Sequence, residues 1–241
     1  MGKYSKEEII HETEKALEHA ESFYQQPFLN YSGKTKDSSE LYSEVISDVV
    51  LKNINKLKEL LPITREQSYD VNHGGAVTTG VKGEDSKQKE KRLAIRIFKD
   101  KTTICSKIGI IIDYETPLNN KKMNKMGKID LLAYNQFDNI LYIIELKCKK
   151  KKEESLLRAT LEVYTYYKIV DEEKLLKDFD EKLKKAGKHD GKKPCVKPAV
   201  LIFEDSRPCV EYNNNCDFNN TNNLLQALNV QVFTLCDSYI C

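Results

Sequence analysis

The longest apolar runs of this chain span only four or five residues, at 108–112, 141–144 and 199–203. A membrane-spanning helix needs about 20 consecutive apolar residues, so these runs predict short buried strands and no membrane partner. The first residues are charged and include no apolar segment like that of a signal peptide. We therefore expect a cytoplasmic chain with a sheet at its centre.

Helical and strand periods divide the chain into successive elements. Helices are predicted over 5–25 with Ser5 as N-cap, from Ser38 or Ser39 to Leu61, and over 85–98, 155–170, 172–185 and 224–228. Strands are predicted over 108–114, 128–134, 140–147, 196–203 and 230–235, and an Asn-rich loop over 211–223. This order predicts an α/β (α+β) fold with a mixed central sheet flanked by helices and an N-terminal helical extension.

The formal net charge of +2 hides an uneven distribution. Residues 1–60 carry 8 basic and 11 acidic side chains, residues 121–152 carry 9 and 3, and residues 198–241 carry 1 and 5. The total alone does not indicate a nucleic-acid binder. Because lysine and arginine bind nucleic-acid phosphates, the basic middle segment predicts where such a contact would form.

The cysteines and histidines do not indicate a metal site. Seven cysteines without a CxxC pair predict free thiols in a reducing compartment. The four histidines are scattered, with no metal-ligand spacing. One set of cysteines could be drawn together as a zinc site, but its spacing matches none of the usual zinc-ligand pairings: Cys209, Cys216, Cys236 and Cys241.

Acidic residues lie inside two of the predicted strands. Asp130 lies in the strand over 128–134, and Glu145 and Lys147 share one face of the next strand. Buried carboxylates need a cation or a hydrogen-bond donor, and two of them from adjacent strands suit Mg²⁺. A lysine beside them could orient a water or stabilise charge on a phosphate. The alternative is a structural ion pair with Lys128 or Lys147.

The pattern Gly127-x-x-Asp130, fourteen residues, then Glu145-Leu146-Lys147 resembles the PD-(D/E)XK nuclease superfamily. The resemblance covers about residues 85–205 and implies a restriction-endonuclease-like αβββαβ core. In such families the helix before the first strand often supplies another acid, and Glu90 occupies that place. The helix after the ExK strand often carries Gln-xxx-Tyr, where this chain has Glu162-xxx-Tyr166.

The resemblance implies a metal-dependent nuclease that hydrolyses DNA, with RNA as the alternative substrate. Its catalytic residues would be Asp130, Glu145, Lys147 and Glu90, of which the three acids would hold Mg²⁺ or Mn²⁺, with Glu162 and Tyr166 as secondary members. DNA would be contacted by Lys128, Lys149, Lys150, Lys151 and Lys152. Residues 1–84 would form a helical extension packed on a nuclease-like domain at 85–241, and a homodimer would suit the cutting of two strands.

Each assignment has an alternative. Glu90 could be a solvated helix residue, with Glu44 or Glu115 supplying the acid in its place. Glu162 and Tyr166 could belong to a helix face that packs on the sheet, and the lysine run could be a solvated strand end. A protein of the same fold could also bind nucleic acid or a protein partner without cutting it.

Overall fold

The computed structural model of the chain describes residues 3–71, 86–99, 107–118, 127–148, 154–189 and 191–235, with the backbone alone at 86–88. No helix within these ranges is long and apolar enough to cross a membrane. Among the described cysteines, Cys195, Cys209 and Cys216 are free thiols, as predicted. Two members of the rejected zinc set, Cys236 and Cys241, lie outside the described residues.

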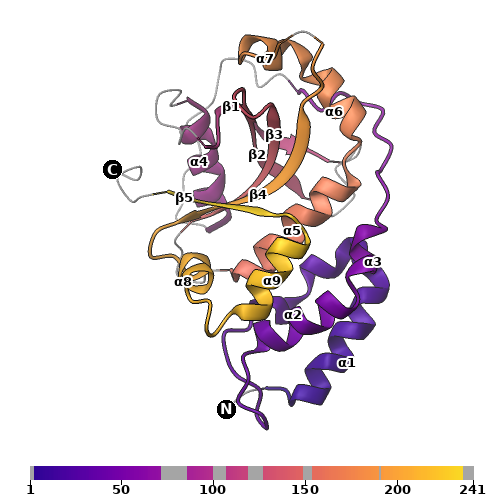
Figure 1. Cartoon of the computed structure of the whole chain (residues 1–241), viewed down its shortest axis with the longest axis vertical. Helices are drawn as coiled ribbons and strands as arrows, with labels where there is room; N and C mark the ends of the chain where they lie inside the picture. Colours follow the sequence, from indigo (N-terminus) through magenta and orange to yellow (C-terminus); the bar gives the residue numbers. More distant parts are fainter. Residues whose placement is uncertain are drawn as a thin grey trace.

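A five-stranded mixed sheet forms the centre of the molecule (Figure 1). Its strands lie in the order β1 (Ile110–Pro117), β2 (Lys128–Asn135), β3 (Ile140–Lys147), β4 (Cys195–Phe203) and β5 (Gln231–Leu235). β1, β2 and β3 are antiparallel neighbours, β4 is parallel to β3, and β5 is parallel to β4. The predicted mixed sheet is confirmed, and both ends of each observed strand lie within three residues of the predicted ends.

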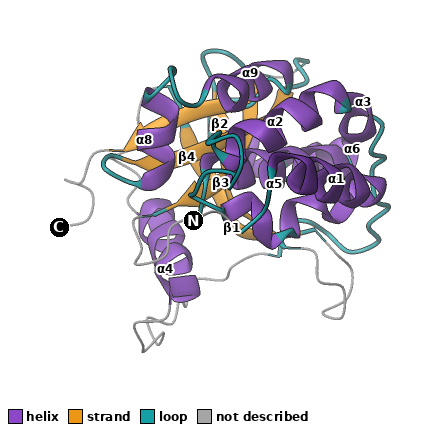
Figure 2. Cartoon of the chain, turned by 90° about the horizontal axis from the view of Figure 1, so that it is seen from below, coloured by secondary structure: helices purple, strands orange, loops and turns teal. Residues whose placement is uncertain are grey.

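Helices cover both faces of the sheet (Figure 2). α4 (Ser86–Lys99) packs on one face, in an apolar cluster that contains the even-numbered residues of β3. α5 (Leu156–Ile169) packs on the other face, in a cluster with Leu141 and Ile143. Because side chains alternate along a strand, the odd-numbered Glu145 and Lys147 lie on the face that α5 covers.

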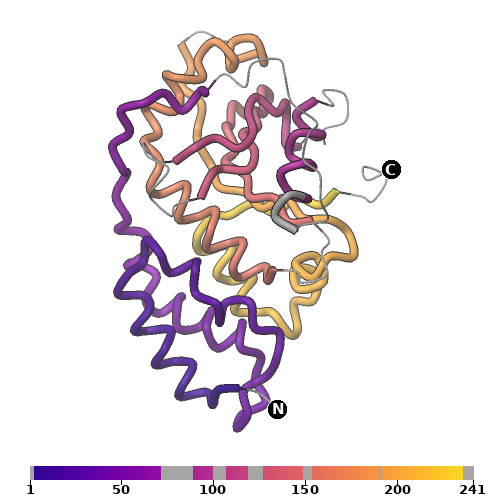
Figure 3. The backbone as a smooth tube through the Cα atoms, turned by 180° about the vertical axis from the view of Figure 1, so that it is seen from behind, coloured from indigo at the N-terminus to yellow at the C-terminus, as the bar shows by residue number. Residues whose placement is uncertain are grey.

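Five short helical segments from the first 60 residues pack at one end of the molecule, beside α5 and α9 (Asn219–Ala227) (Figure 3). They are α1 (Lys6–Ala16), the 3-10 helices η1 (Leu17–Gln25) and η2 (Pro27–Asn30), α2 (Tyr42–Lys52) and α3 (Ile54–Lys58). Their buried side chains belong to the same apolar cluster as those of α5 and α9. The N-terminal segment therefore shares a core with the rest of the chain. The predicted boundary between residues 84 and 85 falls outside the described residues.

The helix predicted over 5–25 is α-helical only as far as Ala16. Ser5 is its N-cap, as predicted. Beyond Ala16 the chain forms a 3-10 helix, and His19 has non-helical angles of φ −119° and ψ 63°. Buried residues recur there at steps of three, which is the period of a 3-10 helix: Leu17, Ala20 and Phe23.

The helix predicted from Ser38 or Ser39 to Leu61 is wrong at its start and in its middle. α2 begins at Tyr42 without a side-chain cap, and Ser39 instead has a φ of 57°. α2 ends before Asn53, whose side-chain amide donates a hydrogen bond to the Val49 carbonyl at 2.9 Å. Asparagine competes in this way for the backbone bonds that would continue a helix.

The segment predicted as an Asn-rich loop over 211–223 contains parts of two helices. α8 (Arg207–Asn213) begins after Ser206, whose hydroxyl accepts a bond from the Cys209 backbone N–H, and Pro208 lies in its first turn. Both are ordinary signals of a helix start. α9 begins at Asn219, earlier than predicted. The helix predicted over 172–185 is instead two helices, α6 (Glu172–Asp178) and α7 (Asp180–Lys185).

Glu44 of α2 caps α9 from outside that helix. Its carboxylate accepts hydrogen bonds from the backbone N–H groups of Asn220 at 2.6 Å and Thr221 at 3.0 Å. A carboxylate at a helix N-terminus satisfies donors that the helix leaves unpaired and interacts favourably with the helix dipole. The structure thus gives Glu44, one of the alternative acids, a structural role away from Asp130.

We predict that Glu44→Ala lowers the free energy of unfolding by about 1–2 kcal/mol, the usual cost of losing a helix cap. Urea denaturation at pH 7 measures this difference. The matched control is Asp48→Ala, because Asp48 lies one turn further along the same helix in an exposed pair with Lys52. Equal losses in the two variants would contradict the capping role of Glu44.

Candidate active site

Asp130 and Glu145 lie next to each other where the ladder between β2 and β3 ends. Leu131 lies opposite Ile144, so the next residues along the two strands are Asp130 and Glu145. The Asp130 carboxylate accepts a hydrogen bond from the Leu146 backbone N–H at 2.8 Å. This bond holds the Asp130 side chain against the end of β3. The structure therefore brings the two acids of the sequence motif together.

The ammonium group of Lys147 lies among three carboxylates. Its Nζ is 2.7 Å from Oε1 of Glu145, 2.5 Å from Oε2 of Glu154 and 3.2 Å from Oε2 of Glu162. The Lys147 side chain is only 6% exposed. A buried ammonium is costly unless opposite charges accept its hydrogen bonds, and these three acids supply them.

Burial alone would lower the pKa of Lys147. The negative charges of Glu145, Glu162 and Glu154 outweigh that effect and hold its pKa well above the usual range. Lys147 is therefore fully charged at neutral pH. A lysine in this state can orient a water or stabilise negative charge on a phosphate, but it cannot act as a general base.

The two motif carboxylates resist ionisation together. Burial is the main cause that raises the pKa of Asp130 to about 7, and the charges of Glu90 and Glu162 add to it against the opposing effect of Lys147. Burial, followed by the charges of Asp130 and Glu162, holds the pKa of Glu145 well above its usual range. Paired carboxylates with raised pKa values gain stability from a cation placed between them.

Glu90 reaches this site from the opposite face of the sheet. It lies in the first half of α4 and is half-buried. After burial, its charge is among the causes that raise the pKa of Asp130, and it also helps to raise the pKa of Lys147. The structure thus places Glu90 within electrostatic reach of both residues, while its membership of the site stays a prediction.

Tyr166 packs against the site, and Glu162 faces into it. The Tyr166 hydroxyl donates a hydrogen bond to Oε1 of Glu162 at 2.9 Å, and the ring packs edge to face on Tyr24 of η1. Gly127 lies directly against that hydroxyl, where a Cβ atom would clash with it. Tyr166 therefore combines helix packing with a contact to the charged cluster, through Glu162.

Glu154 is the member of the cluster that the sequence pattern did not identify. It lies just after the lysine run and directly before Ser155, the N-cap of α5. An acid beside a helix N-cap is common, because it suits the helix dipole, so its place alone gave no indication of function. Only the fold shows that this helix begins beside Lys147.

The remaining predicted lysines lie on the surface or outside the described residues. Lys128 is exposed and pairs with Glu115 at 3.3 Å. Of the ion pairs considered as the alternative, the pair of Lys147 with Glu145 forms, at 2.7 Å. Glu115, an alternative acid, is thereby placed at Lys128. The run at 149–152 lies outside the described residues.

The donor chemistry of the site fits Mg²⁺ or Mn²⁺. Within the described ranges no group of three or more His, Cys, Asp or Glu side chains is arranged to hold a metal ion, and the Lys147 ammonium lies among three of the acids. Mg²⁺, however, is usually bound by one or two carboxylates together with water and substrate phosphates. The pair of Asp130 and Glu145, each with a raised pKa, is a donor set of that kind.

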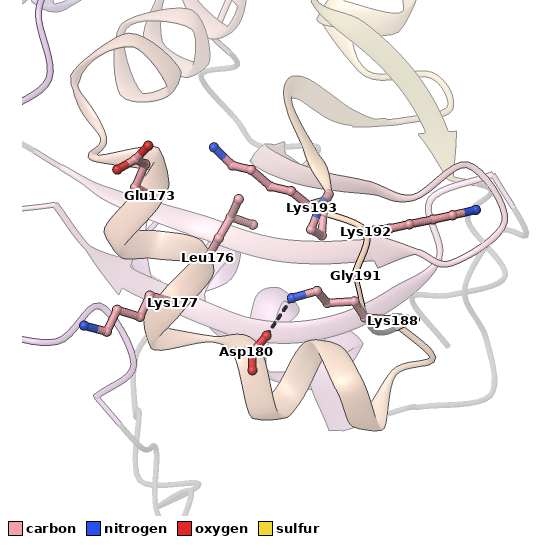
Figure 4. Close-up of a pocket in the computed structure, with 9 residues that line it drawn as sticks. Glu173, Leu176, Lys177, Asp180, Lys188, Gly191, Lys192 and Lys193 are labelled. Carbon is pink, nitrogen blue, oxygen red and sulfur yellow. Dashed lines mark hydrogen bonds and ion pairs between the residues drawn. The ribbon is translucent and has the colours of Figure 1, made fainter.

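Two hollows in the described part of the chain contain none of the predicted site residues. One, of about 570 Å³, lies between α6, α7 and the residues at 188, 189 and 191–194 (Figure 4). Its Lys188 pairs with Asp180 at 2.6 Å, and Lys177 and Lys192 point in opposite directions (Figure 4), so its lysines do not converge on an anion. The other, of about 590 Å³, lies beside α8, α9 and β5 and is lined mainly by Asn and Gln side chains.

No protein-family model, curated protein or solved structure matches this chain. At the site itself, where the ladder between β2 and β3 ends, Lys147 lies among Glu145, Glu154 and Glu162 beside Asp130, with Glu90 within electrostatic reach.

Proposed function

We propose that this protein is a metal-dependent nuclease that hydrolyses phosphodiester bonds of DNA. The observation that carries the proposal is the contact of the Lys147 ammonium with Glu145, beside Asp130, on two adjacent strands. These are the residues of the sequence motif: the charge of Lys147 lowers the pKa of Asp130, that of Asp130 raises the pKa of Glu145, and that of Glu145 raises the pKa of Lys147. Clusters of mutually perturbed titratable groups occur preferentially at functional sites.

The topology supports a restriction-endonuclease-like core as part of this proposal. The elements α4, β1, β2, β3, α5 and β4 follow each other as αβββαβ, with the first three strands antiparallel and β4 parallel to β3. α6 and α7 are inserted between α5 and β4. The motif acids lie on β2 and β3, where the resemblance places them.

Asp130, Glu145 and the Leu146 carbonyl would hold one Mg²⁺ or Mn²⁺ ion, with Glu90 nearby. The ion would polarise the scissile phosphate and stabilise charge on the leaving oxygen. Lys147, held charged by its acidic neighbours, would orient the attacking water and stabilise charge on the phosphate. Lys128 and the lysines at 149–152 would contact the DNA backbone, which needs positive charge but no base-reading group.

The proposal is tested by incubating the protein with linear, circular and branched DNA, and with RNA, in Mg²⁺, Mn²⁺ or EDTA. We expect cleavage of DNA that requires the metal and is lost in Glu145→Gln, because the amide cannot replace an anionic ligand. Glu173→Gln, which removes an exposed carboxylate from α6, is the control and should cleave normally. Absence of metal-dependent cleavage of every substrate would instead favour a nuclease-fold module that binds without cutting.

A further inference from the structure

Lys147 has more acidic partners than the proposed chemistry requires. Glu145 both contacts Lys147 and belongs to the pair that would hold the metal ion. A carboxylate that turns toward a metal ion weakens its bond to an ammonium. Metal binding would therefore take one partner from a lysine that is only 6% exposed, and a buried charge that loses its partner is strongly destabilising.

We propose that Glu154 is a positioning residue that keeps the Lys147 ammonium in place when Glu145 binds the metal. The inference rests on the proposed function. Its basis is geometric: Oε2 of Glu154 lies 2.5 Å from Nζ of Lys147, closer than the oxygens of Glu145 and Glu162. Glu154 thus makes the shortest of these three contacts to the ammonium, from outside the metal-binding pair.

The start of α5 fixes Glu154 in position. The next residue, Ser155, is fully buried, and its hydroxyl donates to the Leu29 carbonyl at 2.6 Å while it accepts from the Arg158 N–H at 3.1 Å. The Ser155 N–H donates to the Asn30 side chain at 3.0 Å. Arg158 lies 3.6 Å from the other Glu154 oxygen. Residues from two parts of the chain therefore hold the backbone and the carboxylate of Glu154.

Glu162 is less suited to this role. Its contact to the Lys147 ammonium is longer, at 3.2 Å, and its second oxygen accepts the hydrogen bond of Tyr166. Glu154 and Glu162 together would leave the ammonium with two anionic partners after Glu145 has turned to the metal, and Glu154 is the nearer of the two.

The first experiment tests the pair itself, without metal. Unfolding equilibria in EDTA are measured for wild type, Glu154→Gln, Lys147→Gln and the double variant. If Glu154 holds Lys147, the two changes are non-additive, and the double variant departs about tenfold from the product of the single effects on the unfolding constant. Glu18→Gln is the control, because Glu18 contacts Lys56 at the same 2.5 Å on the exposed surface. Additive effects of Glu154→Gln and Lys147→Gln would overturn the inference.

The second experiment measures Mn²⁺ affinity by calorimetry for the same four proteins. We expect Glu154→Gln to weaken binding about tenfold when Lys147 is present and to have little effect in the Lys147→Gln background. If Glu154 were a metal ligand, or acted only through its charge, the loss would be as large in both backgrounds, which would overturn the inference.

If Lys147→Gln does not fold, Lys147→Arg replaces it. The larger guanidinium should reduce the effect of Glu154→Gln on Mn²⁺ affinity, and an undiminished effect would count against the inference. Wild type that binds no Mn²⁺ would overturn the proposed function, and the metal role of Glu154 with it, even if the pair in EDTA is coupled.

Discussion

Replacing Lys147 with methionine should lower the free energy of unfolding of the metal-free protein by about 3–5 kcal/mol at pH 7. Removal of one member of a buried charge cluster leaves the others without their counter-charge. Here Glu145, which is 7% exposed, and Glu162, which is 13% exposed, would lose the ammonium that they share. Guanidinium denaturation in EDTA measures the effect.

The matched control for this prediction is Lys56→Met. The Lys56 ammonium also contacts a carboxylate at 2.5 Å, that of Glu18, but both side chains are exposed. Exposed ion pairs contribute little to stability, because water solvates the charges whether or not they are paired. A loss in Lys147→Met no greater than that in Lys56→Met would show that the cluster at the end of β3 is not a buried charge network.

Raising the pH from 4 to 7 without metal should destabilise wild type relative to Asp130→Asn by up to about 4 kcal/mol, since one pKa unit corresponds to about 1.4 kcal/mol. Burial raises the pKa of Asp130 from its ordinary value of 3.8 to about 7. Between these values the folded protein holds a proton that the unfolded chain has released, so increasing pH favours unfolding. The stability contributed by the protonated Asp130 is fully present only below pH 3.8 and is lost as the pH rises from there to about 7.

The comparison with Asp130→Asn is needed because other groups titrate in this range. Asp130 interacts with Lys147, Glu90, Glu162 and Glu145, and the raised pKa of Glu145 acts in the same direction. Denaturation at four pH values in EDTA and in Mg²⁺ measures the slopes. Mg²⁺ should flatten the difference, because a cation favours the ionised carboxylate. Parallel pH profiles for the two proteins in EDTA would show that Asp130 titrates normally.

The strands were predictable because the signal for them is local. β3 begins and ends at the residues predicted from its apolar run. The spacing of the ExK pattern predicted that Glu145 and Lys147 share one face of that strand. The local sequence does not show which of the buried acids belong to the site. Asp113 also lies in an apolar strand and is fully buried, yet it pairs with Lys182 at 3.3 Å, away from the site. Charge and period alone do not separate such a residue from Asp130.

Contacts over long sequence distances explain what the sequence did not predict. Glu154 reaches Lys147 because the start of α5 is anchored on η2 through Ser155. α9 is capped by Glu44, 176 residues away along the chain. A pattern read within a window of about ten residues cannot contain a partner that the fold supplies, and this is why the start of α9 was wrongly predicted as a loop. The start of α8 is different, because its signals, Ser206 and Pro208, are local.

The packing of α2 on α9 also affects how the chain folds during synthesis. The hydroxyls of Ser47 and Thr221 lie 3.0 Å apart, although 174 residues separate them. At roughly 5–20 residues per second, translation reaches Thr221 on the order of ten to thirty seconds after Ser47. The apolar side of α2 that α9 covers is without that partner throughout this interval. α9 therefore completes, late in synthesis, a part of the core that α2 begins.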